Sequence, residues 1–262
     1  MINHRIPMGK GLVPAPSFLS IVQHNCLRSW NVSLSLFASF KEAGTYPSIL
    51  LLQDPPVNKA HLPSFNGFKS FFPPFRNLPV AAYVHMSFLS NYTMLPRFRG
   101  EDNVLALDIS SDEPLFGTSF YSFTIINAYS TNTVDHQVYS VQLDILLPDL
   151  GFPLLVVGDL NIHNPLSDPL LSFSPGQISS SAPYFEKAAE AGFAPLNPAG
   201  EYTKFPLVGK ACPLVIDLTL ANLLLLPMVK SGKASLPSTG SDHIPITITL
   251  APPSQSQKPL RP

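Results

Sequence analysis

The sequence predicts an α/β fold in which two packed β-sheets carry helices on their outer faces. Short apolar, β-branched runs recur along the chain, and only a few segments have helical spacing. Prolines are frequent, with 29 in 262 residues, against a usual share of about 5%, which favours short strands and rigid loops. A helical bundle is therefore excluded. The elements are also too few and too irregularly spaced for an eightfold barrel.

The strand predictions come from eight apolar runs. Two of them, Ile49–Leu52 and Leu154–Val157, are apolar at consecutive positions, which is typical of central strands covered on both faces. The predicted strands are Phe18–Gln23, Ile49–Gln53, Val80–His85, Val104–Ile109, Phe120–Asn127, Leu154–Gly158, Leu214–Leu220 and Ile244–Leu250.

Three segments have the spacing of amphipathic helices, namely Trp30–Ala43, Val134–Leu147 and Ala182–Gly192. Pro183 suits the first turn of the last helix. We expect one folded domain over residues 17–250. Residues 1–16 and 251–262 are Pro-rich and lack periodicity, so they are expected to be flexible tails.

Composition narrows the class of protein. With 45% hydrophobic residues and a mean hydropathy of +0.18, the chain can bury a sizeable core, which excludes a disordered or fibrous protein. The net charge of -1 means that a polyanion must be bound by a local site. The two cysteines, Cys26 and Cys212, are too few for a disulfide framework. No secretory leader or membrane span is evident, so an intracellular protein is expected.

Polar residues interrupt six of the apolar runs at their ends. An Asn or Asp at such a position is commonly a turn former, so each case alone carries little weight. The order of all six along the chain is the informative feature. The polar segments are Gln23–Asn25, Gln53–Asp54, Asn127–Tyr129, Gly158–His163, Ile216–Asp217 and Ser241–His243.

This order resembles the endonuclease/exonuclease/phosphatase superfamily, and the resemblance covers about residues 18–250. The run Gly158–Asn161 is similar to the Gly-Asp-Phe-Asn of the family, and Ser241–His243 matches its Ser-Asp-His. Leu51–Pro55, Val80–Val84 and Ile216–Thr219 resemble the endonuclease domains of non-LTR retrotransposons in particular. The resemblance implies a four-layer, DNase I-like α/β sandwich of two mixed sheets flanked by helices.

The resemblance also implies a DNA endonuclease that hydrolyses phosphodiester bonds with Mg²⁺, for which Mn²⁺ can substitute, and without a nucleotide cofactor. Mg²⁺ takes oxygen ligands and usually only one or two carboxylates. Asp54 is the candidate carboxylate ligand, and Asn25 beside it is expected to be a neutral oxygen ligand or to orient the site. Asp242 would complete the metal and water network. The family has Glu at the position of Asp54, so the carboxylate reach is shorter here by about 1.5 Å. Displacements of about 1 Å can cost roughly a hundredfold in rate, so either the strand has moved to compensate, a water bridges the gap, or the activity is weakened.

Five further residues have tasks in hydrolysis. Asp159 would position or deprotonate the attacking water, while Asn161 and Tyr129 would donate hydrogen bonds to phosphate oxygens. His243 would donate to the transition state or transfer a proton. Asp217 is the candidate carboxylate on its far nitrogen, where it would hold both charge and orientation.

Contacts to DNA are expected from Thr203, which resembles a DNA-contacting threonine of the retrotransposon branch, and from Ser241 and His163. His163 is equally well explained as a solvated loop residue. Basic residues are sparse, and they can contact phosphates only if their loops share an edge with the site. They are Arg97 and Arg99 in one loop, Lys204 and Lys210 after Thr203, and Lys230 and Lys233 before the Ser-Asp-His run.

Two alternatives stay open. A catalytically impaired family member that binds DNA or protein is favoured by Asp54 and by the near-neutral charge. A phosphatase acting on a small substrate would need a cluster of basic residues, which the sequence does not show. For the preferred reading we expect DNA as partner, no membrane, a monomer, and a nuclear location. Whether the chain is free-standing or a piece of a reverse transcriptase polyprotein stays open.

Overall fold

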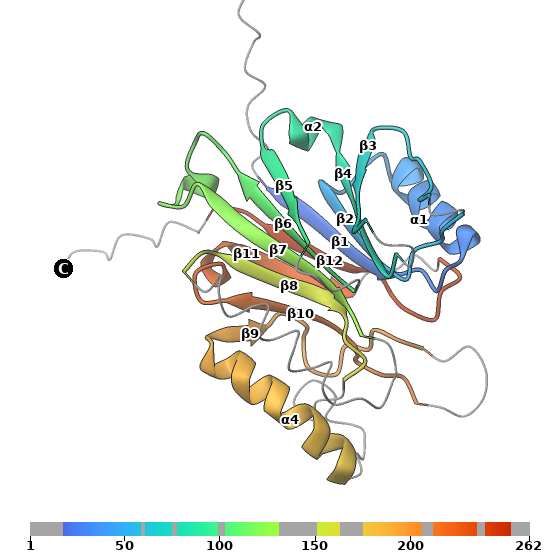
Figure 1. Cartoon of the computed structure of the whole chain (residues 1–262), viewed down its shortest axis with the longest axis vertical. Coiled ribbons are helices and arrows are strands. Elements are labelled where there is room, and N and C mark those ends of the chain that lie inside the picture. Colours follow the sequence, from blue (N-terminus) through green and yellow to red (C-terminus); the bar gives the residue numbers. More distant parts are fainter. Residues whose placement is uncertain are drawn as a thin grey trace, which may run out of the picture.

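The structure is a computed structural model that describes residues 18–58, 61–74, 78–98, 103–130, 151–162, 175–205, 212–234 and 239–252. Its strands form two six-stranded sheets that lie face to face (Figure 1). Among the described helices, none combines the length and the hydrophobicity needed to cross a membrane.

The first sheet has the strand order β11-β12-β1-β2-β4-β3. Its central strands β1 and β2 are parallel, and all its other neighbours are antiparallel. The strands are β1 (Leu19–Asn25), β2 (Ile49–Gln53), β3 (Phe68–Phe71), β4 (Val80–His85), β11 (Val229–Ala234) and β12 (Ile246–Leu250).

The second sheet has the order β5-β6-β7-β8-β10-β9. It repeats the mixed arrangement, because only the central pair β7 and β8 is parallel. The strands are β5 (Thr93–Arg97), β6 (Val104–Ser110), β7 (Ser122–Tyr129), β8 (Leu154–Asp159), β9 (Phe193–Pro195) and β10 (Asp217–Asn222).

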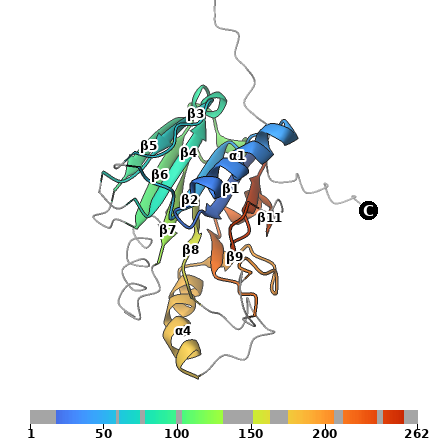
Figure 2. The same ribbon diagram turned by 90° about the vertical axis from the view of Figure 1, so that its right-hand side faces the viewer.

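Helices cover the outer faces of both sheets (Figure 2). Helix α1 (Trp30–Ala43) buries Leu36 and Phe37 against the outer face of the first sheet. It begins at Ser29, whose side chain accepts a hydrogen bond from the backbone of Val32, and it ends at Gly44 in the left-handed conformation. On the second sheet, α4 (Pro175–Glu190) packs Tyr184 and Ala188 into a separate apolar cluster. The order of layers is thus helix, sheet, sheet, helix, as predicted.

Short helical turns complete the described elements: α2 (Met86–Leu89) and the 3-10 turns Leu115–Gly117 and Leu226–Met228.

The main core lies between the sheets and is built from alternate residues of the central strands. Ile21 of β1, Leu51 of β2, Ile125 of β7 and Val157 of β8 all point into it and are buried. Because side chains alternate across a strand, the next inward position on each strand lies two residues further on. This register carries the polar residues at the strand ends to the same side as the core.

A pair of buried amides joins the two sheets within this core. The Nε2 atom of Gln53 on β2 donates to Oδ1 of Asn127 on β7 at 2.6 Å. Asn127 in turn donates to the backbone oxygens of Leu52 and Ala81, each at 3.0 Å. Both amides are fully buried. Since buried polar groups are costly unless paired, these bonds favour one alignment of the sheets over others.

Most predicted elements are confirmed, and several have identical bounds: α1, β2 and β4. The helix prediction Ala182–Gly192 was wrong in its start, because α4 begins at Pro175 and Pro183 lies inside the helix. Pro183 is exposed, so solvent can satisfy the backbone group that loses its N–H partner. Arg97, predicted in a loop, belongs to β5 and pairs with Asp108. The last two predicted strands also start later than expected, at Asp217 and Ile246.

Some predictions lie outside the described residues. These are the helix Val134–Leu147, the candidate His163, the basic residues Arg99 and Lys210, the N-terminal tail and most of the C-terminal tail.

Candidate active site

The site forms where the inward rows of both sheets change from apolar to polar. On β1, Asn25 comes four residues after Ile21 and faces the same side of the sheet. On β8, Asp159 comes two residues after Val157 and also faces inward. In the second sheet, Asp159 lies opposite Asp217 of β10 and Tyr129 of β7. The polar ends of several strands therefore meet at one edge of the sandwich.

Asn25 and Asp159 link the two sheets at this edge. The Nδ2 atom of Asn25 donates to Oδ2 of Asp159 at 2.8 Å. The other carboxylate oxygen accepts the backbone N–H of Asn161 at 3.1 Å. The amide of Asn161 donates to the backbone oxygen of Ser130 at 2.6 Å, which ties the loop after β8 to the end of β7. The orientation of the Asp159 carboxylate is thus fixed from both sheets.

Gly158 permits the close approach of β8 to β7 beside this carboxylate. A Cβ atom at position 158 would lie 1.8 Å from the backbone oxygen of Ala128. No side chain can be accommodated at that distance. This contact gives a physical reason for glycine before Asp159 that does not depend on any resemblance.

His243 and Asp217 form a buried pair. The Nδ1 atom of His243 lies 2.8 Å from Oδ2 and 3.0 Å from Oδ1 of Asp217. An ionised carboxylate can only accept hydrogen bonds, so Nδ1 carries a proton and donates a hydrogen bond to Asp217. The contact is the one predicted for Asp217, on the far nitrogen of His243.

The other nitrogen of His243 faces the remaining carboxylates. Its Nε2 atom lies 3.8 Å from Oδ2 of Asp159 and 3.6 Å from Oδ1 of Asp242. Within the described part of the chain, Nε2 and Asp242 Oδ1 are buried and have no hydrogen-bond partner. Such orphaned polar atoms usually mark a place for a ligand, an ion or water.

Electrostatics separate the roles of these groups. Burial, followed by the charge of Asp217, raises the pKa of Asp159 to about 7. Burial alone would lower the pKa of His243, but Asp217 and then Asp159 outweigh it, and the pKa is raised. His24 differs, because burial and the nearby His243 lower its pKa to about 3. His24 is therefore neutral, and it contacts the hydroxyl of Thr239 at 2.9 Å.

Thr203 does not face solvent, which corrects its prediction as a DNA contact. Its hydroxyl accepts the backbone N–H groups of Ile216 at 3.1 Å and Asp217 at 3.0 Å, and the residue is 0% exposed. The backbone of the same segment also bonds to Ile244, next to His243. Thr203 thus positions the Asp217–His243 pair rather than touching a substrate.

Asn197 is a second positioning residue, and the sequence analysis missed it. Its Nδ2 atom donates to the backbone oxygen of Asp217 at 3.1 Å, and its Oδ1 accepts from Thr219 at 2.7 Å. No motif marks this asparagine, because its role depends on how the chain beyond β9 packs on β10. Ser241 also acts within the protein: its hydroxyl donates to the Asn25 backbone and accepts from the His243 N–H. A contact of Ser241 with DNA stays a prediction.

Asp54 lies at the same edge, on the residue after β2. Its carboxylate accepts from Nε of Arg28 at 2.7 Å. Oδ1 of Asn25 accepts the backbone N–H of Leu27 at 2.9 Å. Both predicted ligands, Asp54 and Asn25, are thus present and are engaged by residues 27–28.

Tyr129 lies near these groups. Burial and then the charges of Asp54 and Asp159 raise the pKa of Tyr129 to about 12, so its hydroxyl stays protonated and can donate a hydrogen bond.

The residues of this edge fit a hard divalent cation. Ligand atoms of Asp159, Asp217 and His243 all lie within 4.8 Å of one another. The His243 and Asp217 atoms that face each other already share a hydrogen bond. The predicted ligands Asp54, Asn25 and Asp242 supply further groups at this edge. Those groups supply oxygen donors, which a hard cation prefers, and the buried oxygen of Asp242 lacks a partner.

Backbone strain is concentrated at the site. Of the five non-glycine residues with positive φ in the described chain, four belong to it: Leu27 (51°), Arg28 (54°), Asp54 (44°) and Asn161 (50°). Asp and Asn tolerate this conformation, whereas Leu and Arg adopt it at a cost. Strain of this kind persists where the surroundings impose it, and it clusters at functional sites.

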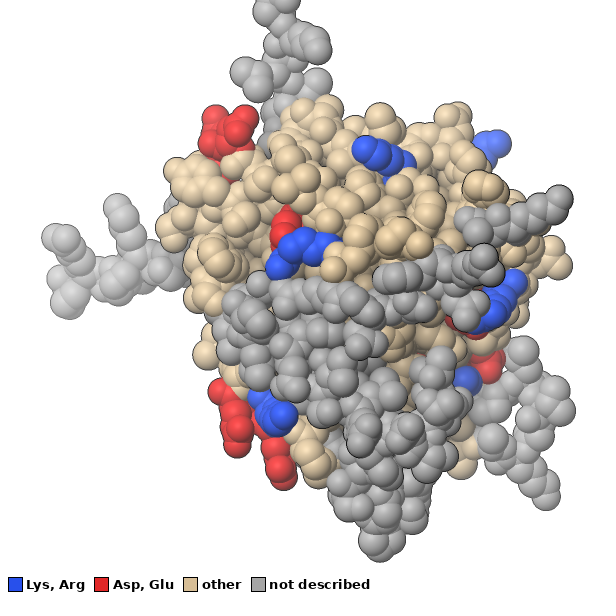
Figure 3. Space-filling model, in the orientation of Figure 1, with Lys and Arg blue, Asp and Glu red and all other residues tan. Residues whose placement is uncertain are grey.

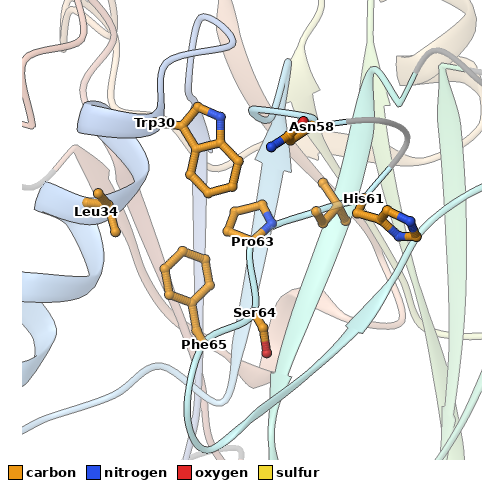
Figure 4. Close-up of a pocket in the computed structure, with 8 residues that line it drawn as sticks. Trp30, Leu34, Asn58, His61, Pro63, Ser64 and Phe65 are labelled. Atoms are coloured by element: carbon orange, nitrogen blue, oxygen red, sulfur yellow. The ribbon is translucent and has the colours of Figure 1, made fainter.

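Features outside this edge carry less chemistry. A cavity of about 470 Å³ lies between α1 on one side and Asn58 and residues 61–65 on the other, and its lining is largely apolar. Figure 4 shows Trp30, Pro63 and Phe65 around it, and no predicted site residue lines it. On the face drawn in Figure 3, the described Lys and Arg side chains are scattered rather than gathered into a continuous basic surface.

No protein-family model matches the chain, and no curated protein matches its sequence. Solved structures do match its fold. The endonuclease domain of TRAS1, a telomere-specific non-LTR retrotransposon, superposes with a TM-score of 0.68 at 16% identity, over 88% of this chain and 98% of that one. The AP endonuclease LMAP from Leishmania major gives a TM-score of 0.68 at 14% identity, over 90% and 89%.

A third match is the 3′-5′ exonuclease NExo from Neisseria meningitidis, with a TM-score of 0.67 at 16% identity, over 89% of this chain and 100% of that one. A structure of NExo as a 3′ phosphatase, bound to a product DNA hairpin, gives a TM-score of 0.65. All of these neighbours act on phosphate esters by name. The two mixed sheets, their outer helices and these neighbours together show that the chain has a DNase I-like fold, a sandwich of two sheets with helices outside, which these nucleases share.

Proposed function

We propose that the protein is a Mg²⁺-dependent DNA endonuclease of the retrotransposon type, which nicks DNA and leaves a 3′ hydroxyl. The observation that carries this proposal is the pairing of His243 Nδ1 with Asp217 while Nε2 points to Asp159 and Asp242 without a hydrogen-bond partner. Phosphodiester hydrolysis needs a general acid and a general base, and an oriented imidazole beside a carboxylate of raised pKa can supply both.

Asp159 is the residue that we assign to the attacking water. A pKa of about 7 lets it accept a proton near neutral pH, where a carboxylate of ordinary pKa is a weaker base. Its hydrogen bonds to Asn25 and the Asn161 backbone hold the carboxylate still while it does so.

His243 and Tyr129 would act on the phosphate. The pKa of His243 is raised, so its imidazolium form can donate from Nε2 to a phosphate oxygen as charge develops there, or pass the proton to the leaving 3′ oxygen. The protonated hydroxyl of Tyr129 can donate to a further oxygen.

Asp54, Asn25 and Asp242 would hold the ion. A bound Mg²⁺, or Mn²⁺ in its place, would supply Lewis-acid stabilisation of the phosphate and of the leaving oxygen.

A plasmid-nicking assay tests the proposal. With Mg²⁺, the wild-type protein should convert supercoiled plasmid to the nicked form, and His243→Ala should lower the rate at least a hundredfold. His61→Ala is the matched control, because His61 lines the cavity beside α1 and should leave the rate unchanged. Equal rates for wild type and His243→Ala would reject the endonuclease.

The second candidate is a catalytically impaired member that binds DNA or a protein. The specific observation in its favour is the ion pair between Arg28 and Asp54, which engages the carboxylate that would bind the metal. Under this hypothesis, wild-type protein would bind DNA in a gel-shift assay with no nicking at any Mg²⁺ concentration.

The nuclear location and the monomeric state remain part of the proposal, to be tested by tagged expression and by light scattering.

A further inference from the structure

Arg28 is attached to Asp54 at two points. Its Nε atom lies 2.7 Å from Oδ1 of Asp54, and its backbone N–H donates to the backbone oxygen of Asp54, also at 2.7 Å. The neighbouring Cys26 N–H donates to the backbone oxygen of Gln53 at 2.9 Å. The segment after β1 is therefore bonded along the end of β2, and the guanidinium is held on the carboxylate.

The backbone on both sides of this contact is in the left-handed region. Leu27, Arg28 and Asp54 have φ values of 51°, 54° and 44°. Side chains such as Leu and Arg rarely adopt this conformation unless the surroundings impose it. The ion pair thus belongs to a fixed arrangement, which distinguishes it from a chance meeting of two flexible surface side chains.

The two partners differ in exposure. The side chain of Asp54 is 15% exposed, whereas that of Arg28 is 65% exposed. A carboxylate so far withdrawn from water needs a counter-charge, and Arg28 supplies it. The guanidinium itself lies toward solvent, so it can swing away without disturbing the core.

The same segment also engages the second predicted ligand. The N–H of Leu27 donates to Oδ1 of Asn25, the oxygen that would otherwise face a cation. Residues 27–28 therefore satisfy both candidate ligands of the first sheet in this conformation.

We propose that Arg28 is an internal counter-cation that competes with the divalent cation for Asp54, so that the ion binds only when the guanidinium leaves. This inference rests on the proposed function, because Asp54 matters as a ligand only if the protein binds a metal. Its consequence is a lower affinity for the ion than the oxygen donors alone would give, in addition to any effect of the shortened side chain.

The test measures Mn²⁺ binding directly, without DNA, by isothermal titration calorimetry and by the loss of the free-ion EPR signal. Arg28→Gly is the variant of choice, because glycine suits a φ of 54° and removes the guanidinium. We expect its Kd for Mn²⁺ to be about two- to fivefold lower than that of the wild type, the effect of an ion pair of modest strength. Arg28→Lys keeps a positive charge and should stay near the wild type.

Two controls isolate the pair. Arg97→Ala removes the arginine of another Arg–Asp pair, on β5 and β6, and should leave Mn²⁺ affinity unchanged. In an Asp54→Asn background, Arg28→Gly should no longer strengthen binding, since its effect depends on the carboxylate.

The outcomes separate this inference from the proposed function. If wild type and Arg28→Gly bind Mn²⁺ equally well, or if the variant binds more weakly, the competition is rejected while metal-dependent hydrolysis stands. If no variant binds Mn²⁺ even at millimolar concentration, the metal-dependent function itself is rejected, and this inference with it. Thermal unfolding of Arg28→Gly confirms that the comparison is between folded proteins.

Discussion

The Nδ1 atom of His243 lies 2.8 Å from Oδ2 of Asp217, and the two residues come from segments that meet only in the folded chain. Asp217 begins β10 in the second sheet, whereas His243 precedes β12 in the first. The residues around Thr203 bond to both segments and thereby hold the pair together. The orientation of the imidazole thus depends on contacts between the sheets as well as on the pair itself.

Asp217→Asn tests this orientation. The substitution removes the negative charge that raises the pKa of His243, while the size of the side chain is kept. We expect kcat for plasmid nicking to fall about 10- to 100-fold. The high-pH limb of the pH–rate profile should move to lower pH, because an imidazole of lower pKa loses its proton earlier. An unmoved limb would contradict the role of Asp217 as the partner that charges His243.

Thr203→Val tests the correction made for Thr203. The variant keeps the shape but leaves the N–H groups of Ile216 and Asp217 without their acceptor, which should destabilise the protein by about 2 kcal/mol. Nicking should lose kcat with little change in KM for DNA, and Thr203→Ser should restore both stability and rate. A raised KM with unchanged urea stability would instead support the original prediction of a DNA contact.

The raised pKa of Asp159 predicts a pH-dependent stability. Its pKa is raised from 3.8 to about 7, so the folded state holds the proton more tightly than the unfolded state. This stabilisation is complete below about pH 4 and is lost as the pH rises through about 7. The side chain in Asp159→Asn is neutral at every pH, so the variant does not lose this stability as the pH rises. Its advantage over wild type in the free energy of unfolding should therefore grow between pH 5 and pH 8, by up to about 3 kcal/mol.

Urea titrations at the two pH values, with EDTA present, measure this difference. A constant difference between Asp159→Asn and wild type would show that the carboxylate is not a buried group of raised pKa.

Asp54→Glu tests whether the shortened carboxylate limits the proposed nicking activity. The added methylene restores about 1.5 Å of reach, and we expect Mg²⁺-dependent nicking to rise. The rate should be measured over a range of Mg²⁺ concentrations, so that tighter metal binding is separated from faster chemistry. Equal or lower activity at every concentration would remove this account of the departure from the family.

Gly158→Ala tests the close approach of β8 to β7. A methyl group there would lie 1.8 Å from the Ala128 oxygen, so the strands must separate or the protein must unfold. We expect a loss of several kcal/mol of stability, of the order of severe overpacking. Gly151→Ala is the control, because nothing lies within 4 Å of its added Cβ. Similar melting temperatures for the two variants would contradict the argument.

The sequence predicted the central strands of each sheet and missed the edge strands. The missed strands β3, β5, β9 and β11 are the outermost strands of their sheets. They are short or half-exposed, and they carry residues that usually argue against a strand, such as Pro96 in β5 and the exposed Lys230 and Lys233 in β11. Edge strands tolerate such residues because one side has no neighbour, so the apolar pattern that reveals central strands is absent from them.

The residues of the site likewise divide into those that the sequence predicted and those that it missed. Asp159, Asp217 and His243 could be placed together because each lies at the end of an apolar run, and a resemblance gave them an order. Thr203 and Asn197 could not be assigned, since their task is to bond backbone groups of β10 and depends on three-dimensional packing. The contact of Arg28 with Asp54 also needs the fold, because a left-handed turn after β1 brings it about.

The hydrogen-bonded amides of Gln53 and Asn127 have a consequence for the chemistry, although neither touches a reacting atom. Asn25 lies in one sheet, and Asp54 and His243 lie just beyond the ends of strands of that sheet, whereas Asp159 and Asp217 lie in the other. A slip of about 1 Å of one layer past the other would therefore misalign the whole site. The interior amides resist that shear. A mutation at either position should therefore abolish the proposed activity, although every side chain of the site is unchanged.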